Sequence, residues 1–378
     1  MNTVRRRAAK WCLILAFTFL ISSPQVLTQT KNSARSQVSS QFASSSDNDK
    51  VEFAAIGDFG AATKGYADSE KSVAAMVEKW NPAFIITLGD NNYKDGAADT
   101  IVKNIGKYYC GYIYNEGAPD KQQCEGWANN HKKTLFFPSL GNHDWYAPYA
   151  QPYIDYFTQL PRSDQGKTRY YDFVQGPVHF FALDSESKEA CLEDWCDGEP
   201  DCAECEKPGV HYEPNGAGPD STQAKWLKKA LEKSTSPWNI VYFHHTPYTC
   251  KNSSKWMRWD FQKWGANAVL AGHKHRYERG WVKGDSDFPY FTNGVGGTAL
   301  SECDTDDCPK KFEEVIFQNV YGAMWVKAKP DEVRFEFYEA KGKSGKLLDR
   351  CTLTKSGSGQ KLSCEVIDKK KAEHCPAQ

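Results

Sequence analysis

Short apolar runs alternate with polar or amphipathic stretches from Val51 to about residue 350. The runs 51–56 and 83–88 have the length and the boundaries of buried strands, and the spacing of apolar residues in 67–80 predicts a helix between them. A strand, a helix and a second strand in this order predict a βαβ unit. Because no internal repeat interrupts the alternation, the pattern indicates a single α/β domain.

Polar residues follow these apolar runs at five places along the chain. They are Gly57-Asp58, Gly89-Asp90, Gly141-Asn142-His143-Asp144, His244-His245 and Gly272-His273-Lys274-His275. In open α/β sheets, ligands bind at the carboxyl ends of the strands, because the loops that leave the strands converge there. We therefore expect an active site at the C-terminal ends of the strands.

The chemistry of this set indicates a metal centre. Taken singly, each signal is weak, because a Gly-Asp pair after a strand is commonly a turn and a helix cap. Together, carboxylate, amide and imidazole donors suit zinc, iron or manganese better than calcium, and their number suffices for two ions. A bridging carboxylate would hold two such cations close together while it reduces their repulsion. Asp90 is the candidate for this bridge.

The order of these motifs resembles the five sequence blocks of the purple acid phosphatases, which belong to the calcineurin-like metallophosphoesterase superfamily. The blocks are Asp58-Phe59-Gly60, Gly89-Asp90-Asn91-Asn92-Tyr93, Gly141-Asn142-His143-Asp144, the Val-x-x-x-His-x-Pro run from Val241 to Pro247, and Gly272-His273-Lys274-His275. The resemblance covers roughly residues 51 to 300, and the single short catalytic domain is similar to the small tartrate-resistant type. It implies an α/β fold in which two mixed sheets form a β-sandwich flanked by helices.

The resemblance also implies a ligand set for two metal ions. Asp58, Tyr93 and His275 would bind Fe(III), Asp90 would bridge, and Asn142, His245 and His273 would bind a divalent Fe, Zn or Mn ion. Tyr93 is the discriminating residue, since a phenolate is a hard, electron-rich donor that stabilises Fe(III). Related zinc or manganese phosphoesterases usually lack this tyrosine.

Three histidines need individual assignment. The ligand of the resembled family precedes a proline by two residues, so His245 is preferred as the ligand. His244 becomes either a group that supports the ligands or a group on the substrate side. His143 resembles the family's histidine that contacts substrate phosphate or protonates a leaving oxygen, and Asp144 is expected to orient its ring. The family's further histidine after the His-x-Pro run is missing from 248–254, so His244 or Lys251 would have to substitute.

The function that the resemblance implies is acid phosphatase activity. A metal-bound hydroxide would hydrolyse phosphate monoesters at an Fe(III)–M(II) centre, and activity would persist in mildly acidic solution. The missing histidine and a cysteine-rich insertion leave open a binuclear phosphodiesterase or pyrophosphatase of the same superfamily. A secreted metal-binding module without catalysis is the alternative of another class, and the intact ligand set counts against it.

The sequence predicts four segments. Residues 1–29 have the basic head, the short apolar stretch and the small-residue end of a signal peptide, although a signal anchor is the alternative. Residues 30–48 form a Ser-rich linker, and 49–350 form the catalytic domain with a Cys-rich insertion at 190–206. Residues 351–378 are expected to be a C-terminal tail. The leader predicts a secreted, vacuolar or lysosomal protein.

Cysteine usage agrees with an oxidising compartment. One of the 13 cysteines, Cys12, lies in the leader, which leaves an even number for disulfides. Cys303 with Cys308 and Cys351 with Cys364 are expected as local pairs, while Cys202 and Cys205 also have the spacing of a zinc knuckle. Asn252 begins a glycosylation sequon.

Charge excludes one class of partner. Removal of the leader takes away four of the 47 basic residues, which leaves 43 against 48 acidic ones. A nucleic-acid binder would show a basic stripe, and none is present in the sequence. No segment beyond the leader approaches the length of a membrane span. Phosphate esters are the expected partners, and the sequence is compatible with a monomer.

Overall fold

The folded part of the chain begins with the predicted βαβ unit. Strand β1 (Val51–Ile56) pairs in parallel with β2 (Phe84–Thr87), and helix α1 (Ala67–Trp80) connects them. Helix α1 has acidic residues in its first turn, which suits the positive end of the helix dipole. It ends at Asn81, which adopts the left-handed conformation common at helix C-termini.

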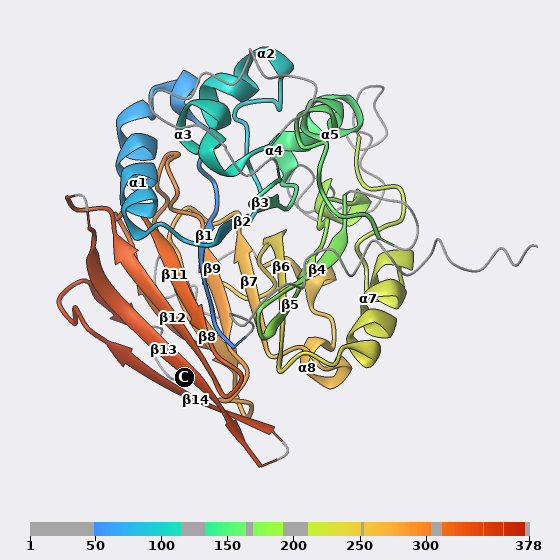
Figure 1. The fold of residues 1–378 in the computed structure, drawn as a ribbon, viewed down its shortest axis with the longest axis vertical. Coiled ribbons are helices and arrows are strands. Elements are labelled where there is room, and N and C mark those ends of the chain that lie inside the picture. The colour runs from blue at the N-terminus through green and yellow to red at the C-terminus, as the bar shows by residue number, and fades with distance from the viewer. Residues whose placement is uncertain are drawn as a thin grey trace, which may run out of the picture. The chain divides into compact units, whose positions relative to one another are not determined.

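The strands form two mixed sheets (Figure 1). The seven-stranded sheet has the order β14 (Gly359–Val366), β13 (Lys346–Ser356), β12 (Glu332–Glu339), β11 (Gly322–Ala328), β1, β2 and β3 (Phe136–Pro138). The eight-stranded sheet has the order β15 (Ala372–His374), β10 (Phe312–Phe317), β8 (Tyr277–Val282), β9 (Tyr290–Asn293), β7 (Ala268–Gly272), β6 (Trp238–His245), β5 (Val178–Ala182) and β4 (Tyr171–Gln175). Strands β1, β2 and β3 are parallel, as are β5, β6, β7 and β9.

Short helices connect and cover the strands. Among the described residues, the further α-helices with given bounds are α2 (Ala98–Ile101), α3 (Lys107–Tyr109), α4 (Asn142–Trp145), α5 (Gln151–Tyr156), α7 (Thr222–Lys233) and α8 (Phe261–Trp264). The 3₁₀ and π turns are η1 (Ala62–Lys64), η2 (Val102–Gly106), η3 (Cys110–Tyr112), η4 (Pro148–Ala150) and η6 (Lys255–Met257). In Figure 1, α7 and α8 lie beside β4, β5 and β6, whereas α1 lies beside the other sheet. The expected architecture of two mixed sheets flanked by helices is confirmed.

The computed structural model describes residues 49–114, 133–163, 169–191, 211–250, 253–303, 312–342, 344–357 and 359–374. All of them fall within the compact unit Ser45–Gln378. The expected signal peptide, the Ser-rich linker, Asn252 of the sequon and most of the Cys-rich insertion lie outside the described residues. Within the described part of the chain, no helix combines the length and apolar character needed to cross a bilayer.

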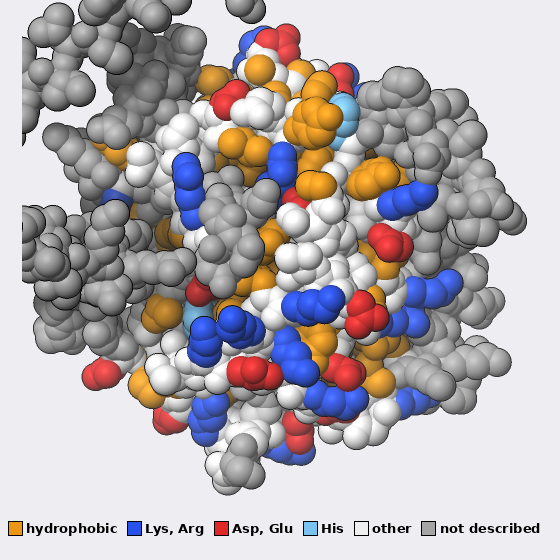
Figure 2. Space-filling model, turned by 90° about the vertical axis from the view of Figure 1, so that its right-hand side faces the viewer, with side chains coloured by type: hydrophobic (Ala, Val, Ile, Leu, Met, Phe, Trp, Pro, Cys, Tyr) orange, Lys and Arg blue, Asp and Glu red, His pale blue; other side chains and the backbone are white. Residues whose placement is uncertain are grey.

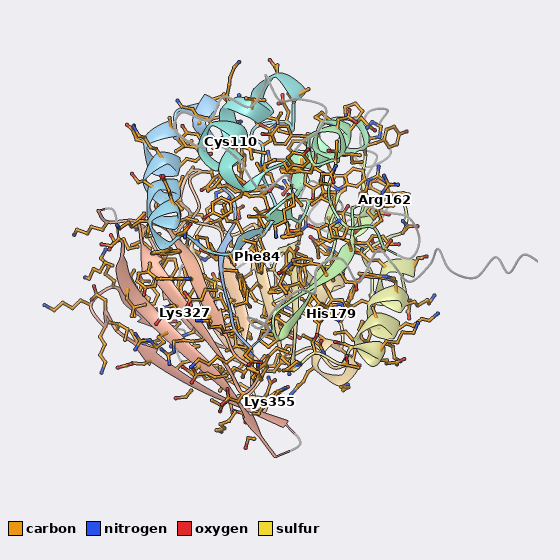
Figure 3. All side chains as sticks on the ribbon, in the orientation of Figure 1. Phe84, Cys110, Arg162, His179, Lys327 and Lys355 are labelled. Atoms are coloured by element: carbon orange, nitrogen blue, oxygen red, sulfur yellow. A yellow bond between two sulfur atoms is a disulfide. The ribbon has the colours of Figure 1, made fainter. Side chains whose placement is uncertain are left out.

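Aromatic side chains fill the space between the two sheets. Phe84 of β2, labelled in Figure 3, packs edge-on against Phe180 of β5, with ring centroids 5.3 Å apart. Phe53 of β1 contacts the same ring at 4.9 Å, and Tyr277 of β8 stacks on Phe337 of β12 at 3.9 Å. Each buried aromatic ring removes a large apolar area from water. Because both sheets contribute to this core, it fixes the position of the parallel strands of one sheet relative to those of the other.

A second apolar cluster fastens α7 to the eight-stranded sheet. Leu227 and Trp226 of α7 are buried in the same cluster as Phe181 of β5 and Val241 of β6. The Oγ of Ser221 accepts a hydrogen bond from the backbone N–H of Ala224 and so caps the start of α7. The outer side of β5 and β6 is therefore covered, and their carboxyl ends are positioned from both faces.

The predicted end of the domain at residue 350 is wrong. Strand β14 pairs with β13 along its whole length, and β15 pairs with β10 at the edge of the other sheet. The segment 359–366 alternates half-buried and exposed residues, which is the pattern of a strand with one covered face. Its charged residues made it look like a tail. The sheets continue to His374.

Two disulfides lie among the described residues with both partners visible. Cys351 and Cys364 face each other across β13 and β14, which confirms that expected pair. Cys303 bonds to Cys250, so the expected pairing with Cys308 is wrong. The Cys250–Cys303 bond links the segment that follows β6 to the segment that follows β9.

Candidate metal centre

The structure brings the strand-end motifs together at one edge of the molecule. Asp58 follows β1, Asp90 follows β2, Asn142 follows β3, and His273 follows β7. Asp58, Asp90 and His273 adopt the left-handed backbone region, with φ of 55°, 49° and 69°. Non-glycine residues occupy this region at a cost, and such strain concentrates at functional sites. The backbone is bent at these positions in a way that turns the side chains inward.

Three other predicted ligands converge around the phenol oxygen of Tyr93. It donates to Oδ2 of Asp90 at 2.8 Å and lies 3.2 Å from Oδ1 of Asp58. Nε2 of His275 lies 3.2 Å from the same phenol oxygen and 3.3 Å from Oδ1 of Asp58. Two carboxylates, a phenol and an imidazole therefore share one small space. This is a donor set that suits a hard cation.

A second group of donors lies on the other side of Asp90. Nε2 of His244 is 3.4 Å from Oδ2 of Asp90, 3.0 Å from Oδ1 of Asn142 and 3.2 Å from Nδ1 of His273. Nδ1 of His244 lies 2.8 Å from the carbonyl oxygen of Leu88, which is the usual partner of an Nδ1–H. This contact directs Nε2 at Asp90, Asn142 and His273. Burial acts to lower the pKa of His244, but the charges of Asp90 and Asp58 raise it to about 10, so Nε2 carries a proton toward the oxygens of Asp90 and Asn142.

His245 also lies beside the second group, since its ligand atom is within 4.8 Å of those of His244 and His273, but its own partners follow β5. Its Nδ1 lies 2.9 Å from Oγ of Ser185, which also accepts a hydrogen bond from the His245 backbone N–H. Its Nε2 lies 3.6 Å from a carboxylate oxygen of Glu186. A serine hydroxyl on Nδ1 and a carboxylate facing Nε2 favour the Nε2–H tautomer. Both histidines are therefore candidate ligands, and His244 is the one that faces Asp90 and Asn142 directly.

His143 lies at the mouth of the centre. Its backbone N–H donates to Oδ1 of Asp90 at 3.0 Å, and its Nε2 lies 3.9 Å from Oδ2 of the same residue. Its Nδ1 contacts the carbonyl oxygen of Lys94, and its ring lies 4.3 Å from the ring of Tyr93. The His143 side chain is 22% exposed, so it faces both the buried donors and solvent.

The expectation that Asp144 orients the His143 ring is wrong. Asp144 instead accepts hydrogen bonds from the backbone N–H of Gly141 at 3.0 Å and from the side-chain amide of Asn91 at 2.8 Å. It therefore satisfies the backbone N–H of Gly141 at the start of α4 and ties this helix to the loop that carries Asp90. Burial, followed by the charge of Asp90, raises the pKa of Asp144 to about 6.

Two glycines give the carboxylates room. A Cβ on Gly272 would lie 2.6 Å from Oδ2 of Asp58, and a Cβ on Gly141 would overlap Asp90. Real Cβ atoms do not approach other atoms so closely. The Gly-His and Gly-Asn-His motifs therefore need glycine so that their backbones can pass beside the two aspartates.

The centre concentrates negative charge in a dry environment. Asp58 and Asp90 are 0% and 1% exposed. Burial acts to raise the pKa of Asp90, but the nearby imidazoles of His244 and His143 bring it well below its usual range. Burial and the charges of Asp58 and Asp90 raise the pKa of the Tyr93 phenol. Buried carboxylates are normally paired or bound to metal ions, so the donor set fits the two-ion hypothesis.

One further strand end was missed by the sequence analysis. The apolar run of β5 ends at Asp184-Ser185-Glu186, which contributes the two neighbours of His245 and anchors Trp145 of α4. The indole N–H of Trp145 donates to Asp184 at 3.1 Å. The signal was the same as at the other strands, an apolar run that ends in an aspartate.

Two known proteins with similar sequences are acid phosphatases, which agrees with the candidate metal centre described above. The chain is 22% identical to tartrate-resistant acid phosphatase type 5 of Mus musculus over 321 residues, which is 78% of this chain and 88% of that protein. The same enzyme of Rattus norvegicus shows the same identity and coverage. Purple acid phosphatases are thus relatives in sequence, at a distance.

Solved structures share the fold. GAP50, the anchor in the inner membrane complex of Plasmodium, superposes with a TM-score of 0.54 at 15% identity, covering 82% of this chain and 90% of that chain. Purple acid phosphatase PPD1 from yellow lupin gives 0.53 at 14% identity, covering 81% of this chain and 54% of that one. The sequence model of the calcineurin-like phosphoesterases matches residues 51–277, which is more than half of the chain. The chain therefore belongs to the calcineurin-like phosphoesterase family.

Proposed function

We propose that this chain is an acid phosphatase of the purple type that hydrolyses phosphate monoesters at a binuclear centre. The observation that carries the proposal is the position of the Tyr93 phenol oxygen, 2.8 Å from Asp90 and 3.2 Å from both Asp58 and His275. A tyrosine oxygen among these ligands distinguishes an Fe(III) site from the sites of related zinc or manganese enzymes. Sequence similarity to tartrate-resistant acid phosphatase type 5 supports the same reaction.

Each ion would take its ligands from different strands. Asp58, Tyr93 and His275 would hold Fe(III), and Asp90 would be shared. Asn142, His244 and His273 would hold a divalent Fe, Zn or Mn ion, with His244 in the place that the sequence had given to His245. When bound, the ions would supply an acidified water nucleophile and neutralise the charge that develops on the phosphate.

His143 would be the residue that acts on the substrate. Its ring is fixed between Lys94 and Tyr93, and one edge of it is open to solvent. A phosphate held at the centre would meet this edge, where the imidazole can donate a hydrogen bond to a phosphate oxygen or to the leaving oxygen. His244, the earlier candidate for the second role, is 0% exposed and is directed at Asn142. His143 would therefore carry the proton to the leaving group.

The proposal includes secretion or delivery to a vacuole or lysosome. Its support is the predicted leader together with the Cys250–Cys303 and Cys351–Cys364 disulfides, since such bonds persist in oxidising compartments. Expression of the full chain in a eukaryotic cell, with detection in medium and organelles, tests this. Protein confined to the cytosol with free thiols would contradict it.

The reaction is tested with the full chain loaded with iron and zinc. Phenyl phosphate and diphenyl phosphate are compared at pH 5, with Asp90→Asn as the variant and Val174→Ala as the control. Val174 pairs with His179 near the start of β5, at the end of the strand away from the centre. We expect hydrolysis of the monoester only, loss of activity in Asp90→Asn and no change in the control.

Two other results would contradict the proposal. Faster hydrolysis of diphenyl phosphate would identify a phosphodiesterase, which is the main alternative. Two bound ions per chain with no turnover of either ester would identify a binding module.

A further inference from the structure

Two exposed aromatic side chains lie directly after the helix that carries Asn142 and His143. Among the described residues, the large hydrophobic side chains that are exposed are Tyr146 at 37%, Tyr149 at 59%, Val174 at 48% and Ile367 at 40%. Tyr146 and Tyr149 are separated by two residues at the end of α4 and in η4. Figure 2 shows hydrophobic side chains gathered in the upper part of one face of the molecule, with lysines and arginines among them.

The Tyr146 side chain contacts two residues of the candidate metal centre, Asn142 and His143. Its hydroxyl accepts a hydrogen bond from the side-chain amide of Asn142 at 3.2 Å. Its ring packs edge-on against the ring of His143, with centroids 4.9 Å apart. The Tyr146 ring therefore lies beside the residue placed to face the leaving group, and part of it remains open to solvent.

Tyr149 has an unusual backbone conformation, and its exposed ring lies against the ring of His211, with centroids 4.3 Å apart. Tyr149 and Ala150 both adopt the left-handed region, with φ of 57° and 52°, although neither is glycine. The carbonyl oxygen of Tyr149 accepts a hydrogen bond from Nη2 of Arg169 at 3.0 Å. Arg169 lies over the ring of Trp145 at 5.0 Å and 4.0 Å from a carboxylate oxygen of Glu213. Strain at an exposed aromatic residue, fixed by an anchored arginine, indicates a functional position.

We propose that Tyr146 and Tyr149 form an aromatic wall that binds the leaving group of the substrate. The inference rests on the proposed phosphatase function and narrows the substrate class to monoesters whose leaving group carries a flat ring, such as a nucleoside. The phosphate would sit at the two ions, His143 would face the ester oxygen, and the ring would stack on the tyrosines beyond it. Stacking of a base on an aromatic side chain is strong enough to select such substrates.

The test compares adenosine 5′-monophosphate with ribose 5-phosphate on the metal-loaded full chain. The two esters share the same primary leaving oxygen and differ by the base. We expect kcat/KM for adenosine 5′-monophosphate to exceed that for ribose 5-phosphate by about tenfold. Tyr149→Asn keeps a residue that tolerates the left-handed region but removes the ring. This variant, and Tyr146→Ala, should abolish the preference.

Matched variants distinguish the effect of losing a tyrosine ring from the effects of losing its hydroxyl group or of damaging the fold. Tyr149→Phe and Tyr146→Phe keep the ring and should keep the preference, and Val174→Ala should change neither rate. A change that lowers both rates equally would reflect damage to Asn142 or to the fold, and it would contradict a role of the ring. Equal kcat/KM values for both esters in the unaltered protein would overturn the aromatic wall alone. Failure to hydrolyse either ester would overturn the proposed function and the wall with it.

Discussion

Nε2 of His244 lies 3.0 Å from Oδ1 of Asn142, although the two residues are far apart in the sequence. The contact joins the carboxyl end of β6 to the start of α4, and Nδ1 of His244 is held by the carbonyl of Leu88. His244 is therefore presented to Asn142 in the orientation that a metal ligand requires. The adjacent His245 is turned toward Ser185 and Glu186 instead.

This difference predicts distinct outcomes for two neighbouring substitutions. His244→Ala should lose one of two bound ions and lower phosphatase activity by more than about 100-fold, because a direct ligand matters more than its supporting residues. His245→Ala should keep two ions and weaken activity by about tenfold. Metal analysis and kcat on both purified variants check this. Loss of an ion from His245→Ala with two ions kept in His244→Ala would show that the assignment is reversed.

The sequence predicted the strand ends well because their signal is local. The parallel pair β1–β2 and the gathering of Asp58, Asp90 and His275 follow from apolar runs that end in polar residues. Tyr93, in contrast, was expected only from the resemblance to the purple acid phosphatases. The choice between His244 and His245 could not follow from spacing. It depends on the orientation of each ring, which is set by Leu88, Ser185 and Glu186 from distant segments.

The end of the domain was missed for a similar reason. Strand β14 lies at the edge of its sheet, so only one face is covered and its composition is polar. A polar edge strand and a solvated tail have similar sequences, and pairing with β13 is what separates them. Asp144 was misassigned because proximity in sequence to His143 said nothing about the backbone groups of Gly141 and Asn91.

The two visible disulfides should contribute unequally. Cys250 and Cys303 are 53 residues apart, whereas Cys351 and Cys364 are 13 apart. Because the longer loop restricts the unfolded chain more, replacing both cysteines of the first pair by serine should cost about 4 kcal/mol of unfolding free energy, against about 3 kcal/mol for the second. Urea denaturation of the two double variants measures this.

Activity offers a second comparison between the same variants. The first pair links segments next to His244 and His275, since the backbone N–H of Ser301 donates to the carbonyl of His275. Loss of the Cys250–Cys303 bond should lower phosphatase activity under conditions in which the protein stays folded. Loss of the Cys351–Cys364 bond should leave this activity unchanged. Equal activity in both would show that the Cys250–Cys303 bond has no effect on the centre.

Glu70 should make stability depend on pH. Burial raises its pKa well above 4.5, and it outweighs hydrogen bonds from Ala61 and Ala62 and the charge of Lys107. Between pH 4.5 and the raised pKa of Glu70, the folded protein holds one more proton than the unfolded chain. The free energy of unfolding therefore falls as the pH rises, by up to about 1.4 kcal/mol per pH unit. Glu70→Gln should remove this contribution to the dependence of the unfolding free energy on pH.

Urea denaturation across pH 5 to 8 measures the effect. Glu78→Gln, on the exposed side of the same helix, is the matched control and should leave the slope unchanged. Identical slopes for the unaltered protein and Glu70→Gln would mean that Glu70 is ionised when folded.

The Tyr93 phenol predicts a colour. If Tyr93 binds Fe(III) beside Asp58, Asp90 and His275, the purified protein should be purple, with a charge-transfer band in the green to yellow region of the visible spectrum. The most direct measurement is this spectrum with iron analysis, on the unaltered protein and on Tyr93→Phe. We expect an iron-containing protein whose band disappears in Tyr93→Phe, whereas a colourless protein that holds two zinc or manganese ions would contradict the Fe(III) site.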